Sequence, residues 1–244
     1  MKKLVLASLI ALVASQAAGC IITSGDDSGD DAFITANWTL RSEASNSTAS
    51  CPPTYDTAAL YNQPIDSAGN SVGQPIIDLF DCVAGHGTSA PLPPTRYLSW
   101  VVIANHDNTS QYATSLSAEV DVTAADKTFS TQILVDGGYF QLTWDLKGAT
   151  SNAPLTCAAA GLTASTSGIQ LQAFVSGSNA SSADLFTCED HAGVTAGYVA
   201  GNYDVLIDAV DPDPVGSAPQ ISSSIRDRNQ VTNLGNVIIP ITGL

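Results

Sequence analysis

The sequence predicts an all-β protein made of two tandem, duplicated antiparallel β-sandwich domains, with one intradomain disulfide each. Three observations predict this fold class. Apolar and polar residues alternate with a period of two, which is the pattern of a strand that buries one face. Landmark residues recur along the chain at a constant offset of 106 residues. Each of the two copies carries one pair of cysteines with the same spacing.

The expected strands follow in the same order in both copies. The first alternates over residues 34–40, a central one over 97–103 and the last over 131–135. Their counterparts are residues 140–146, 203–209 and 237–241. Clusters of Gly, Pro, Asn, Asp and Ser lie between them at short spacing, as in a sandwich or barrel. With roughly six or seven strands in about 105 residues, each copy has an ordinary sandwich size.

The duplication is carried by residues that are rare enough to exclude coincidence. The pairs that coincide at the offset of 106 are Trp38 and Trp144, Leu40 and Leu146, Cys51 and Cys157, Cys82 and Cys188, and Tyr97 and Tyr203. The register needs no gap between the tryptophan and the tyrosine of each copy, although residues 59–77 share no identity with their counterparts. We predict domains at 32–136 and 139–244. The short joint Asp136-Gly137-Gly138 predicts that they abut with restricted freedom.

Four of the five cysteines form two pairs whose members stand 31 residues apart. Of the three possible pairings, only Cys51–Cys82 with Cys157–Cys188 keeps each copy self-contained. Paired structural cysteines are typical of oxidising compartments outside the cytosol. The fifth, Cys20, needs a separate explanation.

The N-terminal residues have the pattern of an export signal. Lys2 and Lys3 precede an apolar stretch over residues 4–14, which is too short to span a bilayer. Small residues follow and end in Ala17-Ala18-Gly19-Cys20. This segment resembles the lipobox of bacterial lipoproteins, although Ala17 stands where that family usually has Leu.

The resemblance implies that residues 1–19 are a signal peptide and that Cys20 is acylated on its thiol, which accounts for the odd cysteine. An ordinary secretory cut near Ala17 or Ala18 is the alternative. Residues 20–31 are acidic and poor in apolar residues, so we expect a flexible tether. Ile21 resembles residues that permit sorting to the outer membrane, which predicts an exported, membrane-anchored protein there, facing the periplasm or the surface.

The charge balance narrows the partners. The formal net charge is −15, and loss of Lys2 and Lys3 with the signal leaves six basic residues against 23 acidic ones, a charge of −17. The six are scattered, whereas nucleic-acid binding needs clustered cations. Membrane attachment is therefore expected through the N-terminal lipid alone. The expected partner is an unknown envelope protein or a glycan, and no nucleic acid and no cofactor are predicted.

Catalysis and metal binding have weak support in the sequence. Residues 69–73 match the nucleophile-elbow string around Ser71, but the strand–turn–helix context and the ordered triad are missing. The three histidines, His86, His106 and His191, form no pair at metal-ligand spacing. We therefore predict no enzyme and no catalytic residue. Oxygen-rich loops follow the same strand in both copies and make Asp107, Asp211 and Asp213 weak calcium candidates, although ordinary turns use the same residues.

A possible interaction patch lies on the central strand of the first copy. Leu98, Trp100 and Val102 point away from the side of Tyr97 and Val101, and their counterparts in copy two are Asp204, Leu206 and Asp208. If exposed, this patch could stack a sugar ring or meet a protein. The alternatives are that both faces of the strand are covered or that the second domain docks there, and we favour the docking interpretation.

The order of the tryptophan and the cysteines along each copy argues against one family of sandwich domains. The core tryptophan of an immunoglobulin domain lies between its two cysteines, whereas Trp38 and Trp144 precede both. The stretch Tyr198-Val-Ala-Gly-Asn-Tyr203-Asp-Val resembles the closing strands of transthyretin-like or carboxypeptidase-regulatory-like sandwiches, although copy one has Thr95 in place of the glycine at 201. That resemblance implies a non-catalytic accessory module. Taken together, the observations predict a lipid-anchored cell-envelope protein that acts as a non-catalytic interaction or structural module. The alternatives are a carbohydrate- or calcium-binding surface module and, less favoured, a serine hydrolase.

Overall fold

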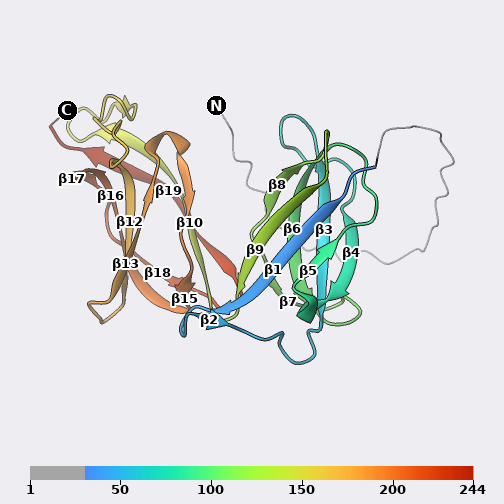
Figure 1. Cartoon of the computed structure of the whole chain (residues 1–244). Helices are drawn as coiled ribbons and strands as arrows, with labels where there is room; N and C mark the ends of the chain where they lie inside the picture. The colour runs from blue at the N-terminus through green and yellow to red at the C-terminus, as the bar shows by residue number, and fades with distance from the viewer. Residues whose placement is uncertain (1–30, 244) are drawn as a thin grey trace.

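Strands account for almost all regular structure in the computed structural model, which describes residues 31–243. The predicted all-β class is confirmed, and we call β1–β9 domain one and β10–β19 domain two (Figure 1). Domain one consists of β1 (Ile34–Ser42), β2 (Ser47–Thr48), β3 (Thr57–Ile65), β4 (Ile76–Asp81), the 3-10 turn η1 (Cys82–Ala84), β5 (His86–Thr88), β6 (Arg96–Ala104), β7 (Gln111–Thr114), β8 (Ala118–Asp121) and β9 (Lys127–Leu134). Within residues 31–243, no helix is long and apolar enough to cross a membrane.

Domain two repeats this order of elements. It consists of β10 (Gly137–Gly148), β11 (Pro154–Leu155), β12 (Gly168–Val175), β13 (Ser181–Phe186), the 3-10 turn η2 (Cys188–Asp190), β14 (Ala192–Val194), β15 (Tyr198–Val199), β16 (Gly201–Asp211), β17 (Asp213–Ser217), β18 (Ile221–Ile225) and β19 (Gln230–Ile241). The duplication seen in the sequence is therefore a duplication of the fold.

Each domain packs two layers of strands face to face, and in domain two the pairing of β17 with β19 joins the layers into one sheet. In domain one, β1 pairs with β2, β5 and β9, and the second sheet has the order β4-β3-β6-β7 with β8 also on β6. In domain two, β10 pairs with β11, β14, β15 and β19, and the other side has the order β13-β12-β16-β17 with β18 on β16. The pairings are antiparallel except that the first strand of each domain pairs in parallel with the last, β1 with β9 and β10 with β19.

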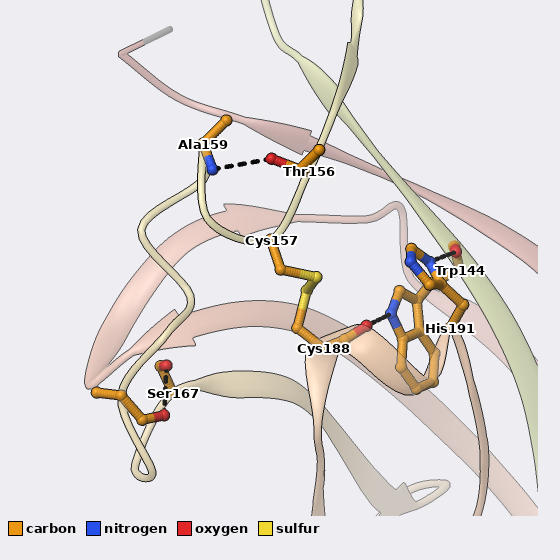
Figure 2. Close-up of a disulfide and its surroundings, with 8 residues drawn as sticks. Trp144, Thr156, Cys157, Ala159, Ser167, Cys188 and His191 are labelled. Atoms are coloured by element: carbon orange, nitrogen blue, oxygen red, sulfur yellow. Dashed lines mark hydrogen bonds between the residues drawn. A yellow bond between two sulfur atoms is a disulfide. The ribbon is translucent and has the colours of Figure 1, made fainter. Parts of the chain in front are cut away.

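The tryptophan and the disulfide of each domain form one unit of the core. The predicted pairing is confirmed, with Cys51 bonded to Cys82 and Cys157 to Cys188. The indole Nε1 of Trp144 donates to the carbonyl oxygen of Cys188 at 3.1 Å (Figure 2), and the tryptophan of domain one makes the same bond at 2.9 Å. The buried indole N–H is thus satisfied next to the bridge in both copies.

A tyrosine corner closes the sandwich in both copies. Tyr97 donates its hydroxyl hydrogen to the carbonyl oxygen of Pro93 at 2.9 Å, and Tyr203 donates to that of Val199 at 2.8 Å. A tyrosine at the start of a strand that bonds the backbone a few residues upstream is a hallmark of Greek-key sandwiches. The matching tyrosines of the repeat therefore have a structural role.

The ungapped register of the repeat is wrong for β3. Ala59 pairs with Val102, and Gln170 pairs with Asp208, the counterpart of Val102. The equivalent of Ala59 is therefore Gln170, an offset of 111 (170 − 59) rather than 106. Compared with domain one, domain two has five more residues between its first cysteine and β12, and five fewer in the hairpin that joins β12 to β13. The two length changes cancel between the cysteines, so the cysteine spacing hides them.

The core of domain one contains a buried polar pair that domain two lacks. Ser99 Oγ donates to Asn62 Oδ1 at 2.8 Å, and both residues are fully buried. Asn62 Nδ2 has no hydrogen-bond partner within residues 31–243. The equivalent cross-strand pair in domain two is Ala173 with Val205, inside one continuous apolar cluster. A buried amide without a partner costs stability.

Replacing this pair by the residues of domain two is expected to stabilise domain one. The double variant Asn62→Ala/Ser99→Val should raise its free energy of unfolding by about 1–2 kcal/mol, because both polar partners leave together. The single variant Ser99→Val should lower it by about 1–3 kcal/mol, because the whole Asn62 amide then lacks a partner. Urea unfolding measures both, and a double variant less stable than the wild type contradicts this account.

The two glycines expected in the joint belong to β10. A side chain at Gly137 would place its Cβ 2.2 Å from the carbonyl oxygen of Tyr198, and one at Gly138 would place it 2.2 Å from that of Gln230. Neither distance leaves room for a Cβ. The glycines therefore allow close strand approach, and they are not a flexible linker.

Asp136 links the two domains through both its side chain and its backbone. Its carboxylate accepts hydrogen bonds from Ser42 Oγ at 2.5 Å and from the amide of Glu43 at 2.6 Å. Its carbonyl oxygen accepts the amide of Ala200, in domain two, at 2.8 Å. Burial alone raises the pKa of Asp136, but these hydrogen bonds outweigh it and hold the pKa below its usual range. The carboxylate is therefore charged where it holds the β1–β2 turn.

The edge between the two sheets closes differently in the two domains. In domain two, β17 pairs with β19 at Gly216 and Ile241. In domain one, β7 and β9 do not pair with each other within the described residues. The side chain of Asn229, which belongs to domain two, lies between them and is only 3 % exposed. Its Oδ1 accepts the amide of Leu134 on β9 at 2.6 Å, and its Nδ2 donates to the carbonyl oxygen of Thr114 on β7 at 2.8 Å. One side chain thus bridges β7 and β9.

Candidate interaction surface

The sheet of β4, β3 and β6 carries apolar side chains on the side facing away from the core of domain one. Cross-strand pairing forms two rows, one from Leu79 through Ala59 to Val102 and one from Ile77 through Tyr61 to Trp100. We call these residues, together with Leu98, the outer face. Ile77 is 44 % exposed and Leu79 is 53 % exposed, both on the edge strand β4. Large apolar side chains exposed side by side are typical of binding surfaces.

An aromatic pair forms the centre of the outer face. The rings of Tyr61 and Trp100 stack at 13° with their centroids 5.1 Å apart. Asn108 Nδ2 donates to the Tyr61 hydroxyl at 2.9 Å, which fixes the tyrosine. Because each ring covers a face of the other, the pair does not offer two free ring faces to a sugar. It offers a rigid apolar ridge, which fits a protein contact better.

Acidic residues border the outer face. Asp81 is exposed at the end of β4, and Glu119 and Asp121 lie on β8 next to Leu98 and Arg96. Glu119 accepts a hydrogen bond from Arg96 Nε at 3.0 Å, and this bond raises the pKa of Arg96. Hydrogen bonds from Thr123 lower the pKa of Asp121, which is therefore ionised at neutral pH. The rim is thus net negative.

Domain two has a polar surface at the equivalent place. Ala59 and Tyr61 correspond to Gln170 and Gln172 through the strand pairing. The patch residues Leu98 and Val102 correspond to Asp204 and Asp208. The apolar residues that remain on this face are Leu206, the 48 % exposed Leu185, Ala183 at the position of Ile77, and Phe174 opposite Asp204. The two domains share a fold and differ here, so the apolar character of the outer face is not required by the fold.

The structure brings together two of the three predicted patch residues at the surface. Leu98 and Trp100 are partly exposed, whereas Val102 is 1 % exposed and lies buried beside Ala59 and Ala104. Sequence reasoning missed the partners on β3 and β4, Tyr61, Ile77 and Leu79. Residues 76–81 do not alternate in polarity: they carry apolar side chains on both faces of the strand, and this was the signal that could have found the exposed pair on β4.

The second domain does not dock over Trp100, contrary to the favoured interpretation. The apolar cluster around Trp100 contains residues of domain one alone. Domain two meets domain one at the other edge of the sandwich. There Arg228 lies over the ring of Tyr112 at 5.0 Å, and Asn229 bonds the backbone. Within the described residues, domain two therefore leaves the outer face uncovered.

The other predicted site residues are placed as follows. Cys20 lies outside the described residues. Asp107 is exposed in a loop that Asn105 organises by accepting the amides of Thr109 and Ser110 at 2.9 and 2.8 Å. Asp211 and Asp213 face each other at the β16–β17 turn. Ser71 lies in the β3–β4 loop, bridged to Ile65, and within residues 31–243 no histidine bonds to it. These loops are built as turns, and they gather no third carboxylate or histidine within the described chain.

One group of possible metal ligands does gather in the described chain. The ligand atoms of Cys157, Glu189 and His191 lie within 4.8 Å of one another. The sulfur of Cys157 is bonded to Cys188 and is not available as a thiolate (Figure 2). His191 Nδ1 lies 3.4 Å from the carbonyl oxygen of Trp144. These residues therefore lie around a disulfide and do not form a metal centre.

Comparison with known proteins gives similarity to solved structures only. No family model and no curated protein matches the chain. A leucine-rich repeat protein of Bacteroides thetaiotaomicron is similar at a TM-score of 0.38 and 11% identity, over 88% of this chain and 27% of that one. The minor pilin GBS52 of Streptococcus agalactiae is similar at 0.31 and 12%, over 87% and 98%. A candidate polysaccharide-binding protein of Bacteroides thetaiotaomicron is similar at 0.30 and 9%, over 87% and 93%. The chain spans about a quarter of the first of these, and we therefore infer function from its own residues.

Proposed function

We propose that this protein is a lipid-anchored cell-envelope protein that acts as a non-catalytic interaction module and binds a protein partner through the outer face of domain one. The observation that carries the proposal is the contrast between the two copies. Four positions of the outer face, those of Ala59, Tyr61, Leu98 and Val102, carry glutamine or aspartate in domain two, and no aromatic pair stacks there within the described residues. A fold that is stable with Gln172 and Ala183 at the positions of Tyr61 and Ile77 has no structural need for an exposed apolar ridge there.

The rim indicates the chemistry of the partner. Asp81 and Asp121 leave a negative border around an apolar centre, and the whole chain carries a formal charge of −15. The complementary partner has an apolar centre with Lys or Arg around it, because matched potentials steer association and exclude other partners. Its binding weakens as salt rises.

The compartment is supported by the cysteines. Two disulfides within the domains account for four of the five cysteines and indicate an oxidising, extracytoplasmic location. Cys20 is the remaining cysteine, and its lipidation at the end of the acidic residues 20–31 would attach the domains to the membrane without a basic surface.

A matched pair of leucine variants tests the proposal. Leu79 and Leu185 occupy equivalent, similarly exposed positions in the two copies. In crosslinking on intact cells followed by mass spectrometry, Leu79→Ser should reduce recovery of a recurrent partner about tenfold, the loss of roughly 1.4 kcal/mol of binding. Leu185→Ser should recover it as the wild type does. Both variants should stay within about 0.5 kcal/mol of wild-type stability, because both side chains are exposed.

The double variant Tyr61→Gln/Trp100→Leu extends the test, because it gives domain one the residues of domain two. It should abolish recovery of the same partner. Equal recovery with Leu79→Ser and Leu185→Ser would remove the outer face as the binding surface. A partner whose binding strengthens with salt would contradict the basic rim.

A further inference from the structure

The last strand of domain one has a free edge. β9 pairs with β1 on one side, and no other strand pairs with it within residues 31–243. The amide of Lys127 donates to the carbonyl oxygen of Phe33 at 3.0 Å, and that of Val135 donates to Arg41 at 2.9 Å. Odd-numbered residues of β9 therefore bond β1. Since backbone groups alternate along a strand, those of the even-numbered residues point to the free side.

Leu134 confirms this orientation. Its amide points away from β1 and is bonded by Asn229 Oδ1 at 2.6 Å. Gln132 and Ser130 follow on the same edge, and their amide and carbonyl groups have no strand partner in the described chain. Asn229 thus ends a row of backbone donors and acceptors that is otherwise open.

A cleft of about 310 Å³ lies along this open row. Its walls come from the segment before β8, from β9 and from the start of β10. They are formed by Leu116, Ser117, Ala118, Phe129, Ser130, Thr131, Gln132 and Tyr139. None of these side chains is a carboxylate or an amine, so the cleft is suited to an uncharged ligand.

Tyr139 adds an aromatic side chain with a hydroxyl group to the wall of the cleft. The residue is only 7 % exposed and lines the cleft, and within residues 31–243 its hydroxyl makes no hydrogen bond. Burial raises the pKa of Tyr139, so the hydroxyl keeps its proton and remains a donor at neutral pH. The hydroxyl is not one of the fully buried polar atoms without a partner, so it is accessible to solvent and can donate to a ligand.

We propose that this cleft binds an extended, uncharged peptide segment that adds to β9 as a new strand. The backbone N–H and C=O groups of an extended peptide can pair with those of Ser130 and Gln132, which are two residues apart on the free edge. A peptide bound in this way becomes an added strand of the sheet. In domain two the pairing of Gly216 with Ile241 joins β19 to β17, whereas in domain one side chains, those of Asn229 and Tyr112, make the corresponding link. This cleft is separate from the outer face, and peptide binding there goes beyond the proposed function.

Binding of a peptide pool tests the proposal. The probe is a set of capped five-residue peptides with Val, Thr, Ser or Gly at each position, titrated to several millimolar into the 15N-labelled protein. The amide signals of Ser130 and Gln132 should shift on binding. Ser130→Pro should weaken binding at least about tenfold, because it removes a cleft-facing N–H and leaves the bonds to β1 intact.

Ser130→Ala is the matched control, since it keeps the backbone N–H, and it should bind as the wild type does. If Ser130→Pro fails to fold, peptides N-methylated at alternate residues make the same comparison and should not bind. Leu79→Ser should bind the pool unchanged, which separates this result from that of the outer face. The proposal is overturned if neither amide shifts, if Ser130→Pro binds as the wild type, or if cellobiose shifts these amides and the peptides do not.

Discussion

Removing the disulfide of domain two is expected to lower its free energy of unfolding by about 3–4 kcal/mol, the chain-entropy value for a loop of this length. The bridge joins Cys157 and Cys188, which are 31 residues apart and almost fully buried in the main core cluster. The change is made with Cys157→Ala and Cys188→Ala together, so that no free thiol remains. At roughly 4–8 °C per kcal/mol, the thermal midpoint of the domain should fall by about 12–30 °C, measured by calorimetry.

The same change in domain one provides the control. Cys51 and Cys82 close a loop of identical length, so the entropic loss should be equal. Domain one starts from a core divided into separate clusters, with the polar pair Asn62 and Ser99 beside them. Its variant should therefore unfold at the lower temperature. A loss below about 1 kcal/mol in both variants would show that the bridges do not restrict the unfolded chain.

The fold could be predicted because its main features leave local marks. A strand that buries one face must alternate, and residues such as Trp38 and Trp144 recur because each packs beside its own disulfide. The parallel pairing of β1 with β9 leaves no such mark, because alternation looks the same in parallel and antiparallel strands. The cancelling length changes around β3 were hidden for a related reason, since residues 59–77 contain no landmark between the two cysteines.

The candidate site could be predicted only in part. Leu98 and Trp100 were found because they alternate with core residues on one strand. Tyr61, Ile77 and Leu79 join them through cross-strand register, which depends on turn lengths and on the order of strands in the sheet. The second domain's contact at Asn229 joins residues 95 and 115 positions apart, and no local pattern encodes such a bond.

The variant Asn229→Gly is expected to lower the free energy of unfolding of domain one, although Asn229 itself belongs to domain two. Asn229 has a φ of 60°, a conformation that glycine adopts without strain, so the change removes the side-chain amide and little else. The amide of Leu134 then loses its partner in a buried place, and the carbonyl oxygen of Thr114 loses its partner in a partly buried one. At about 1–3 kcal/mol for each buried group, the free energy of unfolding of domain one should fall by roughly 2–5 kcal/mol.

Asn152→Gly separates this effect from the entropy that any new glycine adds to the unfolded chain. Asn152 has a φ of 53° and is exposed on domain two, so its replacement should cost no more than about 1 kcal/mol. Urea unfolding followed by fluorescence measures both variants, and small-angle scattering should show a wider range of interdomain distances for Asn229→Gly alone. Equal losses in the two variants would mean that water replaces the bridge at little cost. The domains would then be held together by Asp136 and the short joint instead.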